Sequence, residues 1–157
     1  QENMNEEDKN RVYDLKLASR DIVEAMKNMR DLQKNIFYYM RSKNGYIKEE
    51  YNSLRIYIAK TIDAVEKLKE HEDDLDIISS IELLRDNVKT LDSIKNSKID
   101  TLIRENKIDS KMATSLINDS AFAYDVTQKL LDAATILWIK DIDIRTLGGK
   151  NEDRQSI

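Results

Sequence analysis

The chain has 157 residues, a length that suits one domain, and it contains three glycines, no proline and no cysteine. A β-rich domain of this length needs more turn residues, and a chain without cysteine forms neither disulfides nor zinc–thiolate sites. Charged residues make up 36% and hydrophobic residues 40%, while the net charge is −4 with both signs interspersed, which argues against nucleic acid as a main partner.

The first predicted helix covers about residues 5–43. Asn5 is a good N-cap, and the acidic residues 6–8 follow it at the positive end of the helix dipole. The run 43–45, Lys-Asn-Gly, supplies a C-terminal stop. Between these signals, apolar residues recur at the spacing of a buried helix face: Val12, Leu15, Ala18, Ile22, Ala25, Met29, Leu32, Ile36 and Met40.

Two further helices are predicted at about 46–70 and 74–105. The acidic cluster 71–74, His-Glu-Asp-Asp, separates them. The apolar face of the first contains Tyr51, Leu54, Ile58, Ile62, Val65 and Leu68. The apolar face of the second contains Ile78, Ile81, Leu84, Val88, Leu91, Ile94 and Leu102.

The fourth predicted helix covers about 110–140, with Asp109 or Ser110 as its cap. Its apolar face is wide: Met112, Leu116, Ile117, Ala121, Tyr124, Val126, Leu130, Leu131, Ala134, Leu137 and Trp138. Residues 142–157 are interpreted as a polar C-terminal tail. The longest nearly apolar run, 133–139, is far shorter than the ~20 residues that span a bilayer, so no direct membrane insertion is expected.

Four amphipathic helices with short connections predict an all-α fold, namely an antiparallel up-down-up-down four-helix bundle formed by residues 1–141 as a single domain. The first helix is longer than the others. An overhanging apolar end would attract a partner, either another domain or a second copy in a homodimer. The chain begins with Gln1 instead of methionine, which predicts a processed protein or a piece of a longer one.

Catalytic chemistry is not expected, and the chain is not predicted to be an enzyme. The only histidine is His71, in a predicted loop, so Ser/His/Asp catalysis is not expected, and no Glu-x-x-His pair of the di-iron type occurs. The consecutive residues 71–74 do not face one point on a regular element, and they are interpreted as a solvated loop. No catalytic residue and no cofactor is therefore predicted.

Carboxylates beside the apolar faces are the weak candidates for metal binding. Asp21, Glu24 and Asn28 lie on adjacent turns of the first helix, and Asn118, Asp119 and Asp125 lie on the fourth. If these helices are neighbours, the groups converge on a hard cation or form a buried polar network. The simpler interpretation is that they flank the core, facing water or pairing with lysines.

Aromatic residues gather near the junction of the first two helices: Phe37, Tyr38, Tyr39, Tyr46, Tyr51 and Tyr57. Tyrosine is enriched at interfaces, so one interpretation is a contact surface. The favoured interpretation is an aromatic plug that closes one end of the bundle.

The segment 109–137 resembles the C-terminal cytoplasmic, PhoU-like region of the bacterial sodium/phosphate cotransporter family. The resemblance is carried by the run 112–120, Met-Ala-Thr-Ser-Leu-Ile-Asn-Asp-Ser, and by the aromatic–aspartate pair Tyr124 and Asp125. Segments 13–24, 32–35 and 46–52 are similar too. The motif residues assigned to interaction by this resemblance are Thr114, Ser115, Asn118, Asp119, Tyr124 and Asp125.

PhoU itself carries the motif Asn-Asp-Leu-Glu-Arg-Ile-Gly-Asp, whose acidic residues bind metal clusters. The corresponding run 118–125 keeps Asn118, Asp119 and Asp125, but it has Ala121 at the Glu position. Because a metal cluster needs several converging carboxylates, the comparison predicts no metal site.

The resemblance implies a non-catalytic regulatory domain of a sodium-dependent phosphate symporter, at the cytoplasmic face of the bacterial inner membrane. Its partner would be the membrane-spanning part of the same polypeptide. Two alternatives stay open at this stage. One is an extracytoplasmic four-helix sensor domain, and the other is a PhoU-like metal-binding regulator with a degenerate site.

Overall fold

The computed structural model describes residues 5–70 and 75–139, apart from the side chains of 89–95. These residues form four helices: α1 (Glu6–Met40), α2 (Gly45–Glu70), α3 (Leu75–Arg104) and α4 (Ser110–Trp138). They contain no strand, which confirms the all-α prediction for the described part of the chain. The largest boundary difference is at the end of α1, which stops at Met40 instead of residue 43.

Polar side chains fix where the helices begin. The Asn5 side chain accepts a hydrogen bond from the Asp8 amide (2.7 Å), and Asp109 accepts one from the Met112 amide (2.8 Å), which confirms both predicted caps. Residues 43–45 do not act as a C-terminal stop. Gly45 is instead the first residue of α2, and Asn44 caps that helix by accepting from the Ile47 amide at 3.2 Å.

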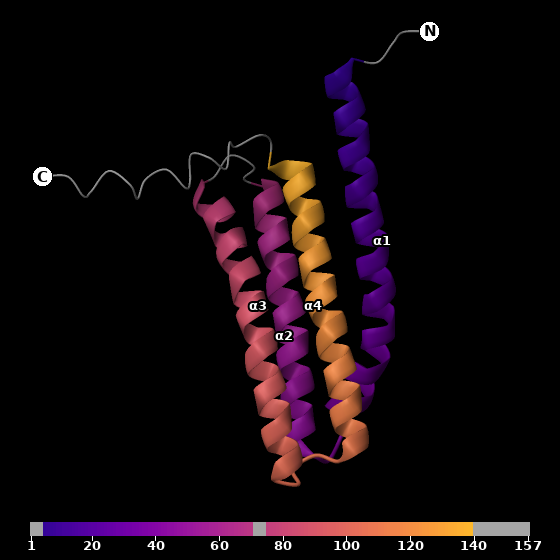
Figure 1. Ribbon diagram of the computed structural model, residues 1–157, viewed down its shortest axis with the longest axis vertical. Coiled ribbons are helices and arrows are strands. Elements are labelled where there is room, and N and C mark those ends of the chain that lie inside the picture. The colour runs from indigo at the N-terminus through magenta and orange to yellow at the C-terminus, as the bar shows by residue number, and fades with distance from the viewer. Residues whose placement is uncertain (1–4, 71–74, 140–157) are drawn as a thin grey trace, which may run out of the picture.

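The two turns at the lower end of Figure 1 are tied together. Asn106 takes a left-handed conformation (φ 55°), and the Lys107 amide donates back to the Leu102 carbonyl at 2.9 Å, as in a Schellman helix end. The side-chain amide of Asn44 then donates to the Lys107 carbonyl at 2.8 Å. This bond joins the α1–α2 turn to the α3–α4 turn.

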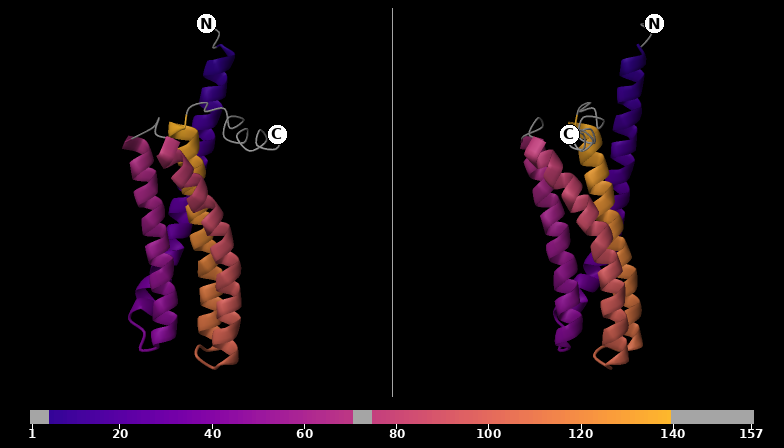
Figure 2. Two further views of the ribbon diagram at one scale, coloured as in Figure 1. Left: turned by 90° about the vertical axis from the view of Figure 1, so that its left-hand side faces the viewer. Right: turned by 60° about the vertical axis from the view of Figure 1, so that its left-hand side comes forward.

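Helix α4 is the element on which the others pack. Among the described residues it contacts α1, α2 and α3, whereas α1 and α3 do not contact each other. Figure 1 shows α1 running down the molecule, α2 back up, α3 down and α4 up, with α4 between α1 and the pair formed by α2 and α3, and both views of Figure 2 show the lower part of α1 approaching α2. The central position of α4 decides where its polar residues find partners.

The first turns of α1 extend beyond the other helices (Figure 1), as its predicted length suggested. Val12 and Leu15 were predicted to be buried, but they are 39% and 41% exposed, and at this level it is Arg11 of α1 that contacts α4. Arg11 marks the lower limit of this overhang. Its guanidinium donates to the carbonyls of Ile136 (3.1 Å) and Leu137 (3.4 Å), at the negative end of the α4 dipole.

The core consists of two apolar clusters along the helices. The cluster nearer the two tied turns is built around Leu32, Tyr51, Ile99 and Leu116. The other cluster lies near the C-terminal end of α4 and is built around Leu68, Ile81 and Leu131. Small residues on α4, such as Ala113, Ala123 and Ala134, belong to these clusters and allow the neighbouring backbones to approach closely.

Besides Val12 and Leu15, three predicted core residues are exposed. Ile62 and Ile117 are 51% and 46% exposed, and Ala121 is exposed as well. On α4 a residue is buried where it faces one of the three neighbouring helices, and the large apolar residues do not form a single buried stripe. Asp119 is consequently 2% exposed, two residues from the exposed Ile117.

Several predictions fall outside the described residues, namely the acidic cluster 71–74, the burial of Leu91 and Ile94, and the polar tail 142–157. Of the helices in the described ranges, none combines the length and the hydropathy required to cross a bilayer.

Leu116 and Ile117 offer a matched test of this packing. Leu116→Ala removes a side chain that is 1% exposed, so it should lower the free energy of unfolding by about 2–5 kcal/mol. Ile117→Ala removes a similar volume from the surface and should change the free energy of unfolding by no more than about 0.5 kcal/mol. Urea unfolding followed by circular dichroism measures both, and equal losses would contradict the orientation of α4.

Candidate functional site

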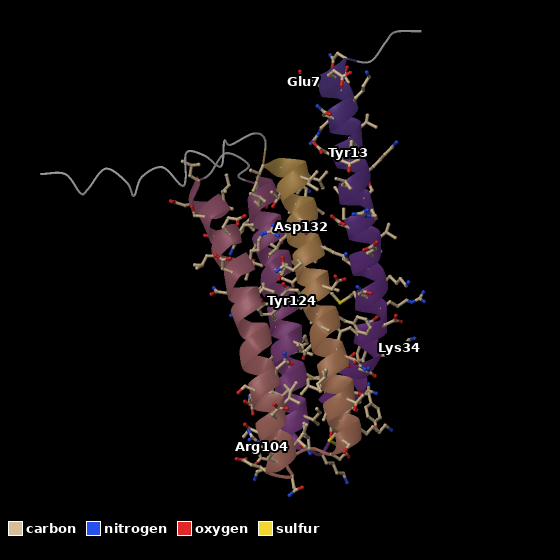
Figure 3. All side chains as sticks on the ribbon, viewed as in Figure 1. Glu7, Tyr13, Lys34, Arg104, Tyr124 and Asp132 are labelled. Carbon is tan, nitrogen blue, oxygen red and sulfur yellow. The ribbon has the colours of Figure 1, made fainter. Side chains whose placement is uncertain are left out.

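The motif residues of α4 do not gather at one point. Thr114 and Asn118 are exposed, and the Thr114 hydroxyl donates to the carbonyl of Ser110 in its own helix (2.9 Å). Asp119 is buried, while Ser115, Tyr124 and Asp125 are partly buried. Figure 3 marks Tyr124 and Asp132 along this helix. The polar residues of α4 therefore face different neighbouring helices.

Asp119 connects α4 to α2. The Tyr51 hydroxyl donates to Asp119 Oδ2 at 2.5 Å, and the side chain of Asn35, from α1, also hydrogen-bonds to this carboxylate. The Tyr51 ring stacks on Tyr39, with 4.5 Å between ring centroids and 19° between planes. The buried carboxylate thus lies where α1, α2 and α4 meet.

Burial dominates the electrostatics of this group. It raises the pKa of Asp119 above its ordinary value, although the hydrogen bonds from Tyr51 and Asn35 act in the opposite direction. Burial also raises the pKa of Tyr51 far above its usual range, and the hydrogen bond to Asp119 adds to this effect. Tyr51 is consequently a protonated donor at any physiological pH.

A second cluster joins α4 to α1. The Asn28 amide donates to Asp125 Oδ2 at 2.5 Å, and the Lys129 ammonium lies 2.7 Å from Glu24 and 3.6 Å from Asp125. The negative charge of Asp21 also acts on Lys129. The ion pair with Glu24 raises the pKa of Lys129, and Lys129 lowers the pKa of Glu24.

The α1 and α4 carboxylates thus meet beside the core around a lysine, as the simpler interpretation expected: Glu24 and Asp125 pair with Lys129, Asn28 bonds to Asp125, and neither carboxylate is buried. Asn118 and Asp119 do not join this cluster. The cation at its centre is the ammonium of Lys129, whose role the sequence interpretation missed, although its position four residues after Asp125 is a recognisable helical pairing. No group of three or more acidic or histidine side chains in the described ranges is arranged to hold a metal ion.

Helix α3 is joined to α4 through Arg85, which the sequence interpretation also missed. The Arg85 guanidinium pairs with Asp132 and donates to Gln128 Oε1 and to the Thr135 hydroxyl, each at 3.3 Å. The three acceptors follow one another at helical spacing on one face of α4. Arg85 itself lies between Leu84 and Val88, within the predicted apolar face of α3. A charged residue at such a position indicates a polar contact with a neighbouring helix, and this was the sequence feature that could have identified it.

Another charged contact holds α3 against α2. Glu50 is 4% exposed and pairs with Lys98, whose pKa is raised by this hydrogen-bonded partner. A buried carboxylate needs such a cation, because an unpaired one would pay a large desolvation cost. The contact fixes the register of α2 and α3 near the tied turns.

The aromatic residues near the first turn divide into two groups. Tyr39 and Tyr51 are buried and stacked, in agreement with the predicted plug. Phe37, Tyr38 and Tyr46 are 57%, 64% and 46% exposed, so they form a surface instead. The plug interpretation is therefore confirmed for Tyr39 and Tyr51, and the contact surface stays a prediction for the exposed aromatic residues.

A shallow apolar groove of about 340 Å³ lies between α1, α2 and α4. Its lining is mostly apolar and comprises Ala25, Met26, Met29, Arg30, Gln33, Ile62, Val126 and Leu130. Met26 and Ile62 are 68% and 51% exposed. Arg30, the charged residue of the lining, forms no ion pair within the described part of the chain.

Comparisons of the chain with protein-family models, with curated proteins and with solved structures found no match.

The raised pKa of Asp119 predicts a pH-dependent difference between the wild type and Asp119→Asn. Between the ordinary pKa of a carboxyl group, about 4, and the raised value, the folded protein binds more protons than the unfolded chain, so the stability contributed by Asp119 is lost as pH rises. The free energy of unfolding of Asp119→Asn should therefore rise relative to the wild type as the pH increases from about 4 towards the raised pKa of Asp119. Asp100→Asn, at an exposed position of α3, is the control. A difference that is constant or falls with pH would refute the assignment.

Lys129→Met should lower the melting temperature, because Glu24, Asp125 and Asp21 would lose their shared cation. Salt screens the remaining repulsion, so the loss should be smaller at high ionic strength. Lys60→Met, at an exposed position of α2, is the matched control. Mn²⁺ or Fe²⁺ should leave the melting temperature of the wild type unchanged, and an increase that Asp125→Ala abolishes would instead identify a metal-binding cluster.

Proposed function

We propose that this chain is a non-catalytic, PhoU-like regulatory domain of a sodium-dependent phosphate symporter. In this proposal its helices form an antiparallel up-down-up-down bundle at the cytoplasmic face of the bacterial inner membrane. The resemblance of 109–137 to that family supports it, and so does the all-α architecture of the described residues. Regulation would operate through contacts between helix surfaces and not through a reaction.

The observation that carries this proposal is the groove between α1, α2 and α4. Its floor is formed by Ala25, Met29, Val126 and Leu130, and its edges by the exposed Met26 and Ile62. Exposed apolar side chains along two helices are typical of sites that receive a third helix. Arg30 would pair with an acidic residue on such a helix. The occupant that we propose is an amphipathic helix from the membrane-spanning part of the same polypeptide.

The titratable groups of α4 favour a structural role. Asp119 is bonded to Tyr51, Asp125 to Asn28 and Lys129, and Asp132 to Arg85. A general acid or base must be within reach of a substrate, and none of these carboxylates contributes to the lining of the groove. Their partners hold helices together, which is consistent with a binding domain.

Lys129 also argues against a metal-binding regulator. A divalent cation among Asp21, Glu24 and Asp125 would have to displace an ammonium that is paired with two of these carboxylates. The degenerate PhoU motif and this internal cation point in the same direction. We therefore place the regulatory contact in the groove and not at the acidic cluster.

The test uses the complete protein that the gene encodes, expressed in its host. Met26→Glu combined with Ile62→Glu introduces two carboxylates at the groove edges, where each native side chain is more than half exposed. The double variant should fold normally by circular dichroism, and it should change the response of phosphate uptake to external phosphate in the same way as deletion of the domain.

Leu83→Glu is the control, because Leu83 is 63% exposed on α3, outside the groove. It should leave uptake and its regulation as in the wild type. If deletion of the whole domain leaves phosphate uptake, its regulation and transporter assembly unchanged, the proposal is wrong. Membrane spans that place the domain outside the cell would contradict it equally.

A further inference from the structure

The end of the bundle that holds the two tied turns has an unusual charge. Residues 32–48, which end α1 and begin α2, include Lys34, Arg41, Lys43 and Lys48 but no aspartate or glutamate, in a chain whose net charge is −4. Arg104, Lys107 and Lys111 lie at the facing α3–α4 turn. Figure 3 shows Lys34 on the lower part of α1 and Arg104 at the base of α3. We call the surface formed by residues 37–48 and 103–111 the loop end.

The loop end carries six cations and two acidic residues, Glu105 and Asp109, so its net charge is positive. Arg41, Lys43, Lys48, Arg104 and Lys111 are exposed, and none forms an ion pair within the described part of the chain. Elsewhere the long cations of this protein are frequently paired, as Lys67 is with Asp63. An anionic partner would therefore meet free charges at this end.

Aromatic side chains are exposed among these cations. Phe37, Tyr38 and Tyr46 protrude from the last turns of α1 and the first turn of α2, and the Lys107 ammonium lies 5.1 Å from the centre of the Tyr46 ring. Phe37 and Tyr38 border a hollow of about 350 Å³ that also contacts Arg41 and Met112. Tyrosine and phenylalanine side chains beside lysine and arginine are the combination found at the interface between a bilayer and water.

We infer that the loop end is a docking surface for the headgroup region of an anionic lipid bilayer. The cations would lie against the lipid phosphates, and Phe37, Tyr38 and Tyr46 would enter the headgroup layer. This contact is peripheral and needs no membrane-spanning helix. It is independent of the proposed role in phosphate transport, because it concerns only this chain and a lipid surface.

The geometry gives the docked molecule a defined orientation. Trp138, the only tryptophan, ends α4 at the side opposite the loop end. Since α4 has 29 residues, Trp138 lies roughly 40 Å from the start of the helix and would remain outside the bilayer. A fluorescent probe at either end can therefore distinguish docking by the loop end from docking by another surface.

The first experiment is co-sedimentation of the chain with vesicles of phosphatidylcholine alone or mixed with phosphatidylglycerol. We expect binding to the anionic vesicles at low salt, little binding to the neutral ones, and loss of binding at about 0.5 M salt. The triple variant Arg41→Gln, Lys43→Gln, Lys48→Gln should bind the anionic vesicles roughly 100-fold more weakly. Phe37→Ser with Tyr46→Ser should also weaken binding.

The matched control is a second triple variant, which removes the same charge from exposed positions on α1 and α2 outside the loop end: Lys16→Gln, Lys27→Gln and Lys60→Gln. It should bind nearly as the wild type does. Equal weakening by both triple variants would show that only total charge matters and would overturn the inference. Folding of each variant is checked by circular dichroism.

The second experiment uses brominated lipid, which quenches tryptophan inside the bilayer. Phe37→Trp in a Trp138→Phe background should shift its emission to the blue and be quenched on anionic vesicles, whereas Trp138 of the wild type should not be quenched. Quenching of Trp138 alone would overturn the orientation. The inference also fails if the folded wild type ignores anionic vesicles, or if the charged surface is used only for self-association, seen as light scattering that the loop-end triple variant abolishes.

Discussion

The structure depends on one constraint, namely that α4 must pack against three helices at once. The polar residues on the packed faces of such a helix need partners on the neighbouring helices, whereas Thr114 and Asn118 stay exposed. Asp119 finds Tyr51 on α2, Asp125 finds Asn28 on α1, and Asp132 finds Arg85 on α3. Small residues such as Ala113, Ala123 and Ala134 provide the space that large side chains would have filled.

These three polar contacts also specify the arrangement. Apolar surfaces pack in many registers at similar energy, whereas the buried Asp119 is costly without its partner, and the partly exposed Asp125 and Asp132 gain their paired contacts in one arrangement only. Exchanging α1 and α3 would leave Asp125 and Asp132 facing the wrong partners. The contacts therefore restrict which helix occupies each side of α4, in addition to any net stabilisation that they contribute.

Features that depend on one helix turn were predicted well from the sequence, whereas features that depend on contacts between helices were predicted poorly. The caps Asn5 and Asp109 were recognised because a cap depends only on residues within one turn. The exposure of Ile117 and Ile62 was not recognised, since it depends on the positions of other helices. Whether α1 carboxylates lie near Asp125 depends on α1 and α4 being neighbours, which they are. Arg85 was overlooked because its acceptors lie about fifty residues away in the chain.

The helix period explains why the two aspartates of the motif run meet different helices. Asp119 and Asp125 are six residues apart, so they project about 120° apart around α4. One meets α2 and the other meets α1. Two carboxylates that point in these directions bind a common ion only if further ligands approach from neighbouring helices. On α4 itself, residue 121, which lies between them in the sequence, is an exposed alanine and supplies no carboxylate. The same run of residues thus serves to join helices.

The groove and the loop end lie on different parts of the molecule, so both proposed contacts can form at the same time. The groove is lined on α1 by residues 25–33, which precede Phe37 of the loop end by four to twelve residues, or roughly 6–18 Å along the helix. If the loop end rests on a bilayer, α1 and α2 stand away from the lipid surface and the groove opens to the side. A helix that emerges from the same bilayer would have to rise only about one to three turns to reach it. Lipid contact would then restrict the orientation of the groove before any helix enters, which reduces the entropy lost when that helix binds.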